Sequence, residues 1–239
     1  MFNLRLIGIE FGVVILAFLT ALVNNGNIVM FDSFYDPIIM GLRSSGLNTF
    51  MEMFTYLGNW QTVTILCILL LAYEKTRKTY GIPITAIAIV STVVNKIFKT
   101  IMQIPRPDAS NMLIEQTGYS YPSGHVTTFV AVLFFLSYLF FKHKEGDIKN
   151  LCYLLLFNLM TIVMAFSRVY LGVHHMSDVI AGWFVGLVCF CVVSMIFYPH
   201  KKEVEKAQAK YRAKREKEKA SLDQVEVEVV NEDEIKDLK

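Results

Sequence analysis

The residues best suited to chemistry lie in the stretch from 167 to 178, SRVYLGVHHMSD, which places Arg168, His174, His175 and Asp178 between apolar runs. Ionisable groups in or beside a membrane span are costly unless they face a cavity, a partner or water, so this cluster indicates a functional site. If the chain is helical from about His174, Asp178 lies on the same face and can orient the imidazole. His175 is three positions from Asp178 and can reach it too. The stretch predicts a histidine with its orienting carboxylate, and helix geometry leaves the choice of histidine open.

Three cations accompany this cluster. Lys99 and Arg106 are seven residues apart, and the prolines at 105 and 107 should end a helix before Arg106. Together with Arg168, these cations could clamp the oxygens of a phosphate group. Snorkelling at a helix end is the plainer interpretation, but it does not explain positive charge on an otherwise basic-poor side of the membrane. Two histidines and an aspartate are also zinc-like ligands, yet three nearby cations would repel a divalent ion and favour an anion.

A third motif, Pro122-Ser123-Gly124-His125, fits the start of a helix. Ser123 is a plausible N-cap, and the first backbone N–H groups of the helix would point at an anion. Gly124 lets a phosphate approach the backbone because no Cβ stands in the way. Capping has no use for a histidine in the first turn, so His125 is expected to transfer protons.

The motifs are K-x6-R-P, P-S-G-H and S-R-x5-H-x3-D, in this order along the chain. In all three motifs, without a departure, the chain resembles the type 2 phosphatidic acid phosphatase family of integral-membrane lipid phosphate phosphatases. The resemblance implies that His174 is the nucleophile that forms a phosphohistidine. It implies that His125 protonates the leaving group and later activates water, while Asp178 orients His174 and stabilises its positive charge. The residues that it assigns to phosphate binding are Lys99, Arg106, Ser123, Gly124 and Arg168.

The same resemblance implies a metal-independent enzyme, without a cofactor, that hydrolyses a lipid phosphate or diphosphate. The family's bacterial substrates are undecaprenyl diphosphate, phosphatidylglycerol phosphate and phosphatidate. Two alternatives stay open: a lipid phosphotransferase that uses the same phosphohistidine, and a non-catalytic lipid transporter or lipid-binding membrane protein. The latter would be expected to lose one of the histidines, and this chain keeps both. The implied partners are the lipid phosphate substrate and membrane lipids, with no nucleic acid and no obligate protein partner.

The elements that must position these residues are apolar runs. Of the 239 residues, 54% are hydrophobic, and six runs stand out: 6–23, 49–73, 82–102, 124–141, 151–171 and 179–198. Each is close to the ~20 residues that cross a ~30 Å hydrocarbon core as a helix. The sequence therefore predicts an all-α, polytopic membrane protein with a bundle of six transmembrane helices, and places the membrane phosphatase domain at 1–198.

Residues 199–239 are predicted to form a charged cytoplasmic helix followed by an acidic disordered tail. Lysine and arginine counts give the orientation, because short cytoplasmic loops hold the excess of positive charge. With the N-terminus inside, eighteen of the 23 basic residues lie on the inner side. The five others are Arg43, Lys96, Lys99, Arg106 and Arg168. The multi-pass chain is thus expected in the cell membrane with both termini cytoplasmic and the active site extracytoplasmic.

Two outer segments have a character of their own. Residues 28–44 mix apolar and polar positions, which favours a short amphipathic segment at the membrane interface. The loop 108–121 carries Met112, Leu113, Ile114 and two tyrosines. It is predicted either to cover the entrance for a lipid tail or to anchor the chain at the interface.

Overall fold

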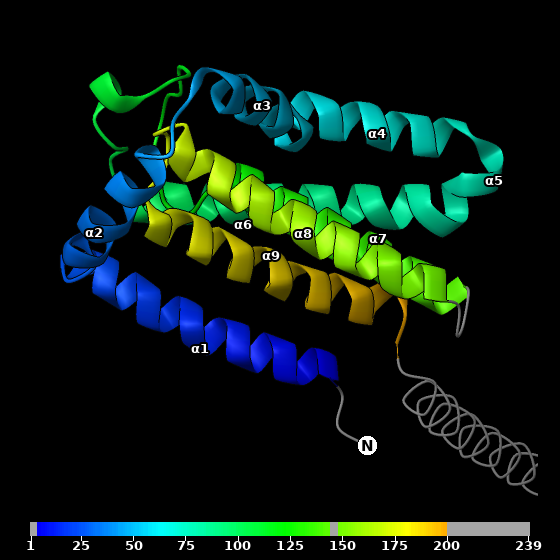
Figure 1. Ribbon diagram of the computed structural model, residues 1–239. Coiled ribbons are helices and arrows are strands. Elements are labelled where there is room, and N and C mark those ends of the chain that lie inside the picture. Colours follow the sequence, from blue (N-terminus) through cyan, green and yellow to red (C-terminus); the bar gives the residue numbers. More distant parts are fainter. Residues whose placement is uncertain (1–3, 144–147, 200–239) are drawn as a thin grey trace, which may run out of the picture. The chain divides into compact units, whose positions relative to one another are not determined.

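The computed structural model describes residues 4–143 and 148–199, and within them every regular element is a helix (Figure 1). Five helices are long and apolar enough to cross a membrane: α1 (Leu4–Asn24), α6 (Ile82–Met102, extended back to Glu74), α7 (Gly124–His143, apolar to Phe141), α8 (Ile148–Tyr170) and α9 (Met176–Phe197). A bent pair of helices passes the same test of length and composition when the pair is counted as one span, which gives up to six spans among the described residues. The prediction of an all-α, polytopic membrane protein is confirmed. The predicted cytoplasmic helix and acidic tail lie outside the described residues, except for residue 199.

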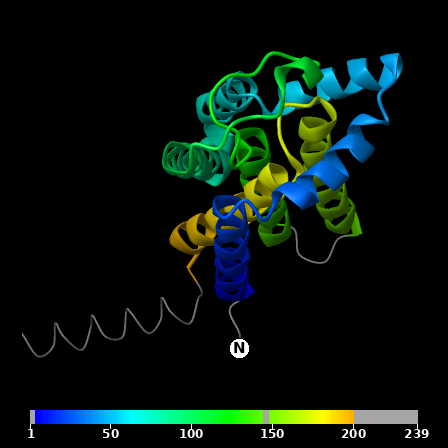
Figure 2. The same ribbon diagram turned by 90° about the vertical axis from the view of Figure 1, so that its left-hand side faces the viewer.

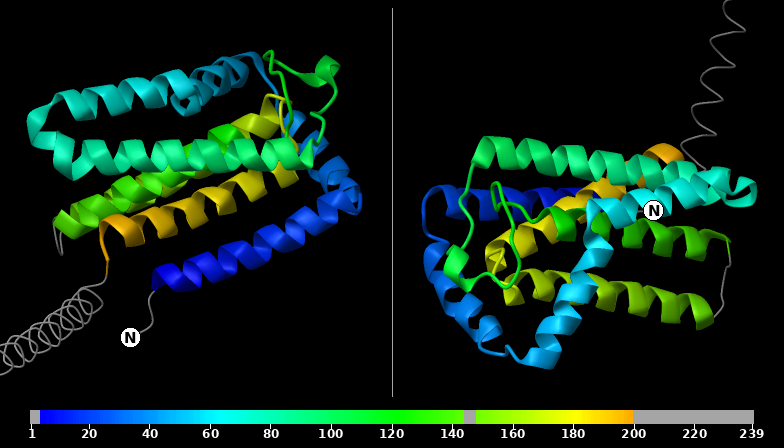
Figure 3. Two further views of the ribbon diagram at one scale, coloured as in Figure 1. Left: turned by 180° about the vertical axis from the view of Figure 1, so that it is seen from behind. Right: turned by 90° about the horizontal axis from the view of Figure 1, so that it is seen from above.

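The α9 helix packs against α1, α6, α7 and α8, and its contact with α7 is especially close (Figures 1 and 3). A Cβ on Gly182 would lie 2.7 Å from the carbonyl oxygen of Ser123, and one on Gly186 would lie 2.6 Å from that of Thr127. No other residue type fits these two positions without a shift of backbone. This approach brings the start of α7 against the start of α9, where Ser123 N donates to the carbonyl oxygen of Asp178 at 3.0 Å.

The second predicted span is broken. It consists of α3 (Ser45–Thr55), the 3-10 turn η1 (Tyr56–Gly58) and α4 (Trp60–Ala72), with a bend of 48° between the two helical pieces. Asn59 lies at the break with extended backbone angles, φ −68° and ψ 147°. Thr62 Oγ1 donates to the carbonyl oxygen of Tyr56 at 2.7 Å and satisfies one acceptor that the break exposes. The helical segment that contains the apolar run 49–73 therefore begins earlier, at Ser45, and is less regular than the sequence suggested. Figure 3 (right) shows α3 running across the bundle before α4 turns along it.

The α4 helix returns to α6 through α5 (Glu74–Thr76) and a π-helical turn, η2 (Arg77–Gly81). The α6 helix ends at Met102, and Gln103 adopts a left-handed conformation with φ 49°. The prediction that the proline pair ends this helix before Arg106 is confirmed. The following loop contains one short turn, η3 (Ala109–Asn111).

The segment expected to be amphipathic is the helix α2 (Val29–Met40), which crosses one end of the bundle (Figure 2). Its carboxylates, Asp32 and Asp36, are buried, whereas Met30 and Phe34 are 83% and 62% exposed. The polar side thus faces the protein and the apolar side faces outward. The amphipathic helix is confirmed, and its position at a membrane interface remains a prediction.

The apolar residues of the loop 108–121 do not form one cover over the cavity but lie in different surroundings. Met112, Leu113 and Ile114 pack on the buried cluster around Tyr170 and Leu171. Tyr121 is fully buried, and its hydroxyl lies 3.1 Å from Thr20 Oγ1. The other tyrosine, Tyr119, is 42% exposed and lines a cavity between α4, α6 and the start of α7. Packing against the bundle, rather than lipid, accounts for most of the apolar residues of this loop.

Candidate active site

His174 and Asp178 meet as their spacing predicted. His174 lies on the short connection between α8 and α9 and is 1% exposed, and its Nδ1 is 3.2 Å from Asp178 Oδ2. The same carboxylate oxygen accepts the backbone N–H of His175 at 2.9 Å, which fixes its position. Nδ1–H therefore donates to Asp178, and Nε2 keeps its lone pair. Burial, and then the charges of Arg168, Arg106 and Lys99, hold the pKa of His174 well below its ordinary value, so the ring is neutral.

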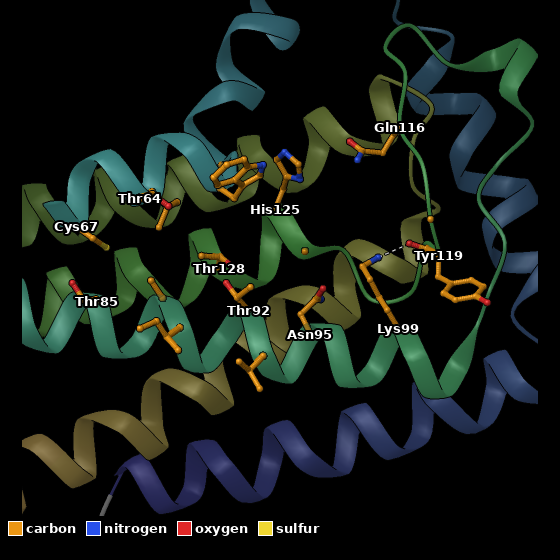
Figure 4. A pocket seen from close by; sticks show the side chains of 18 of the residues that line it. Thr64, Cys67, Thr85, Thr92, Asn95, Lys99, Gln116, Tyr119, His125 and Thr128 are labelled. Carbon is orange, nitrogen blue, oxygen red and sulfur yellow. Dashed lines mark hydrogen bonds between the residues drawn. The ribbon is translucent and has the colours of Figure 1, made fainter.

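Arg106 reaches the free nitrogen of this ring: its Nη1 lies 3.3 Å from His174 Nε2. The same Nη1 donates to the backbone carbonyl oxygen of Val173 at 2.7 Å, and Nε donates to that of Gly118 at 3.0 Å. Lys99, in the last turn of α6, donates through Nζ to the carbonyl oxygens of Tyr119 at 2.6 Å and Ser120 at 2.9 Å (Figure 4). Both cations thus hold the loop after α6 in place while lining the cavity.

Arg168 is fully buried at the end of α8. Its Nη1 donates to Thr55 Oγ1 at 2.6 Å and its Nη2 to Gln116 Oε1 at 3.1 Å. Its Nε has no hydrogen-bond partner among the described residues. Within that part of the chain, no Asp or Glu forms an ion pair with any of the three cations. A buried positive charge without a counter-ion is unfavourable, so the site is built to receive an anion.

The start of α7 differs from the expectation in one respect. The amide of Ser123 is already bonded to the carbonyl oxygen of Asp178, so it is not free to bind phosphate as the motif suggested. The buried hydroxyl of Ser123, by contrast, has no partner among the described residues. Asn95 of α6 donates to the carbonyl oxygen of Pro122 at 3.1 Å, and a Cβ on Gly124 would lie 3.1 Å from Asn95 Oδ1. Gly124 therefore makes room for Asn95, and it also lines the cavity.

The second histidine of the motifs, His125, faces the cavity from the first turn of α7. Its Nε2 lies 2.5 Å from Oδ1 of Asn59, the residue at the break in the second span. The sequence offered one signal for this partner, a single asparagine in the middle of the apolar run 49–73. Thr55 and Gln116, the partners of Arg168, were missed as well.

His175 points elsewhere. Its Nδ1 lies 2.7 Å from Asp36 Oδ2 of α2, and Asp36 Oδ1 accepts the N–H of Met176 at 2.9 Å. Asp32 accepts the N–H and the hydroxyl of Ser177 at 2.9 Å and 2.7 Å. Burial lowers the pKa of His175, but the hydrogen bond and charge of Asp36 raise it overall. The two carboxylates of α2 thus hold the first turn of α9, and His174, not its neighbour, lines the cavity.

The cavity has a volume of ≈ 740 Å³. One end is formed by the polar group already described, and Figure 4 shows His125, Lys99 and Gln116 there. The other end runs between α4 and α6 toward Cys67 and Thr85. Most of its wall on that side is apolar, with residues such as Val63, Ile68, Leu71, Ile89 and Val93. A polar head and an apolar chain can therefore be held in one continuous space.

Fold and site together define a class: a multi-pass helical membrane protein whose cavity ends at two histidines and two cations. A third cation, Arg168, is bonded to Gln116 of the cavity wall. The chain belongs to the PAP2 superfamily, whose family model matches residues 79–202, so the resemblance noted in the motifs is confirmed.

Two relatives illustrate the similarity. Phosphatidylglycerophosphatase B of Bacillus subtilis (strain 168) is 29% identical over 158 residues, 64% of this chain and 76% of the relative. An undecaprenyl-diphosphatase of Sulfolobus acidocaldarius is 32% identical over 149 residues, 59% of this chain and 65% of the relative.

Among solved structures, a transmembrane PAP2 type phosphatidylglycerolphosphate phosphatase from Bacillus subtilis superposes with a TM-score of 0.71 and 24% identity. The match covers 78% of this chain and 94% of that one. Aquifex aeolicus LpxE matches with a TM-score of 0.54 and 25% identity, over 66% and 91% of the two chains. The first of these comparisons establishes the fold.

Proposed function

We propose that this protein is a lipid phosphate phosphatase that hydrolyses a lipid phosphate or diphosphate by way of a phosphohistidine. The observation that carries the proposal is the group of three cations, of which Arg168 is fully buried and Lys99 and Arg106 are partly buried, beside a neutral histidine in a largely apolar cavity. These cations have no acidic partner among the described residues. A phosphate group supplies the missing negative charge, and its oxygens would satisfy Arg168 Nε and Ser123 Oγ. Family membership and the names of the relatives point the same way.

The reaction has two displacements. His174 Nε2 attacks phosphorus, the bond from phosphorus to the lipid oxygen breaks, and His125 gives a proton to that oxygen. Water then attacks phosphorus, the bond from phosphorus to Nε2 breaks, and His125 takes a proton from the water. Asp178 stabilises the positive ring of the phosphohistidine. Lys99, Arg106 and Arg168 bind the phosphoryl oxygens, where charge develops in the transition state.

The apolar part of the cavity favours a lipid as the leaving group. Fourteen residues of α6 separate Lys99 from Thr85, which is roughly 20 Å at the rise of a helix. The groove between α4 and α6 therefore has the length of a long hydrocarbon chain. Phosphatidylglycerol phosphate and undecaprenyl diphosphate, the substrates that the relatives' names suggest, and phosphatidate are the candidates.

Purified protein should release inorganic phosphate from at least one of these three lipids in buffer that contains EDTA, because the cations replace a metal as the partner of phosphate. Vanadate, which adopts the five-coordinate geometry of the transition state, should inhibit. Phosphate release is measured with the His174→Ala protein as a control for contaminating phosphatases. Loss of activity in EDTA with recovery on adding zinc would contradict this mechanism. Transfer of the phosphoryl group to an added alcohol, without release of phosphate, would indicate a phosphotransferase.

We propose further that the site is extracytoplasmic and that both termini are cytoplasmic, from the distribution of basic residues. Ser110 is exposed at the end of the molecule that holds the site, and Lys75 is exposed in α5. In a variant without the four native cysteines, cysteine at position 110 should react with a membrane-impermeant thiol reagent in intact cells, and cysteine at position 75 should react only after lysis. The reverse labelling pattern would overturn the orientation.

A further inference from the structure

The side chain that holds His125 comes from the broken span. Asn59 Oδ1 lies 2.5 Å from His125 Nε2, although 66 residues separate them in sequence. The residue before it, Gly58, packs so closely that a Cβ there would lie 3.3 Å from His125 Cδ2 and 2.9 Å from the terminal methyl of Met164. The two residues at the break, Gly58 and Asn59, therefore both pack against the imidazole of His125.

The contact between Asn59 and His125 depends on the break in the helix. Asn59 has extended backbone angles, and the helix resumes only at Trp60. The turn before the break also carries Thr55, which accepts a hydrogen bond from Arg168. One interrupted segment thus supplies a polar partner to the proton-transferring histidine and another to a phosphate-binding arginine.

The chemistry of the amide decides which nitrogen of His125 is protonated. An amide oxygen only accepts hydrogen bonds, so Nε2 must carry the hydrogen, and Nδ1 is left to exchange protons. The charged groups that face this ring are the cations Arg168, Arg106 and Lys99. No carboxylate of the described residues is hydrogen-bonded to it.

The two histidines therefore have different partners. A carboxylate beside His174 suits a ring that becomes positive when it is phosphorylated. A neutral amide beside His125 suits a ring that must bind and release a proton in every cycle, because the amide favours neither state strongly.

We propose that Asn59 is a positioning residue that fixes the Nε2–H tautomer of His125. Before the first displacement the ring carries a hydrogen on both nitrogens, and Nδ1 gives its proton to the leaving lipid oxygen. The neutral Nε2–H ring that remains then takes a proton from water at Nδ1 in the second displacement. The inference rests on the proposed phosphatase function and adds to it the residue that sets the protonation geometry of the acid and base.

Three variants test this role: Asn59→Ala, Asn59→Asp and the control Thr62→Val. Removing the acceptor with Asn59→Ala should lower kcat for the lipid substrate about 10-fold to 10²-fold, part of the 10²- to 10⁴-fold that a positioned acid and base contribute, with little change in KM. The leaving group of p-nitrophenyl phosphate needs no proton. With this substrate, Asn59→Ala should slow the phosphorylation of His174 much less than the hydrolysis of the phosphohistidine. Vanadate binding should persist, because the three cations are untouched.

The Asn59→Asp protein separates positioning from packing. A carboxylate keeps the acceptor but favours the protonated ring, so activity should be retained and both limbs of the pH–rate profile should move to higher pH. Thr62→Val alters the same bend without touching His125, because among the described residues Thr62 Oγ1 bonds only to the carbonyl oxygen of Tyr56. It should keep the wild-type pH–rate profile.

Wild-type turnover in Asn59→Ala, or an unshifted profile in Asn59→Asp, would overturn the assignment. So would a loss in Asn59→Asp as large as in Asn59→Ala, since the amide would then be acting as a donor. Absence of phosphate release from every lipid in the wild-type and Thr62→Val proteins would instead reject the proposed function itself.

Discussion

His174→Ala should lose hydrolysis of lipid phosphate by roughly 10⁴-fold or more and should form no phosphoenzyme. His174 lines the cavity, is oriented by Asp178 and presents Nε2 toward Arg106, whereas no other described side chain combines these contacts. The phosphoenzyme is trapped by acid quench after mixing with ³²P-labelled substrate. Because the proposed mechanism makes Nε2 of the deleted ring the attacking atom, no change of pH or leaving group should restore activity.

His175→Ala is the matched control. His175 bonds to Asp36 on α2 and does not line the cavity, so its loss should cost about tenfold or less, near the ~1.5 kcal/mol of one charge-assisted hydrogen bond. A phosphoenzyme that persists in His174→Ala but disappears in His175→Ala would move the nucleophile by one residue. His125→Ala should be distinct from both, since a substrate with a good leaving group should still phosphorylate His174 and the intermediate should accumulate.

Arg168→Lys should lower kcat/KM at least about 10²-fold although the charge is unchanged, comparable to the loss of one preorganised donor at an oxyanion. The guanidinium bonds to Thr55 and Gln116 and leaves Nε without a partner among the described residues, and an ammonium group cannot reproduce these three directions. Steady-state kinetics and a thermal unfolding curve should be measured on the same preparation, so that loss of activity is separated from loss of fold.

Arg77→Lys is the corresponding control. Arg77 lies in the π-helical turn after α4, where its Nε donates to the carbonyl oxygen of Leu71 at 2.7 Å. It should retain normal turnover. Near wild-type turnover in Arg168→Lys would mean that Arg168 is a structural counter-ion rather than a phosphate ligand.

The parts of the site that could be predicted from sequence are those with local patterns. The spacing of His174 and Asp178, the proline pair around Arg106 and the start of α7 after Ser123 each depend on a few neighbouring residues. The apolar runs likewise predicted the membrane-spanning helices, because length and composition determine that property.

The parts that sequence analysis missed depend on contacts between distant segments. Asn59 meets His125, Thr55 meets Arg168, and Asp36 meets His175, the last pair across 139 residues. None of these partners has a spacing rule, since the packing of whole helices decides which side chains meet. The hydrogen bond of the Ser123 amide was missed for the same reason. The start of a helix predicts free N–H groups, but close packing of α7 on α9 lets the Ser123 N–H bond to the carbonyl oxygen of Asp178.

The carboxylates of α2 have a consequence for where an anion can settle. Two helices, α7 and α9, begin at the site, and each start carries the partial positive charge of its helix dipole. At α9 that charge is already balanced inside the protein, because Asp32 and Asp36 accept the N–H groups of Ser177 and Met176. At α7 the first amides have no acceptor within their helix. The field of the backbone is therefore more favourable to an anion at the start of α7, beside His125, than at the start of α9.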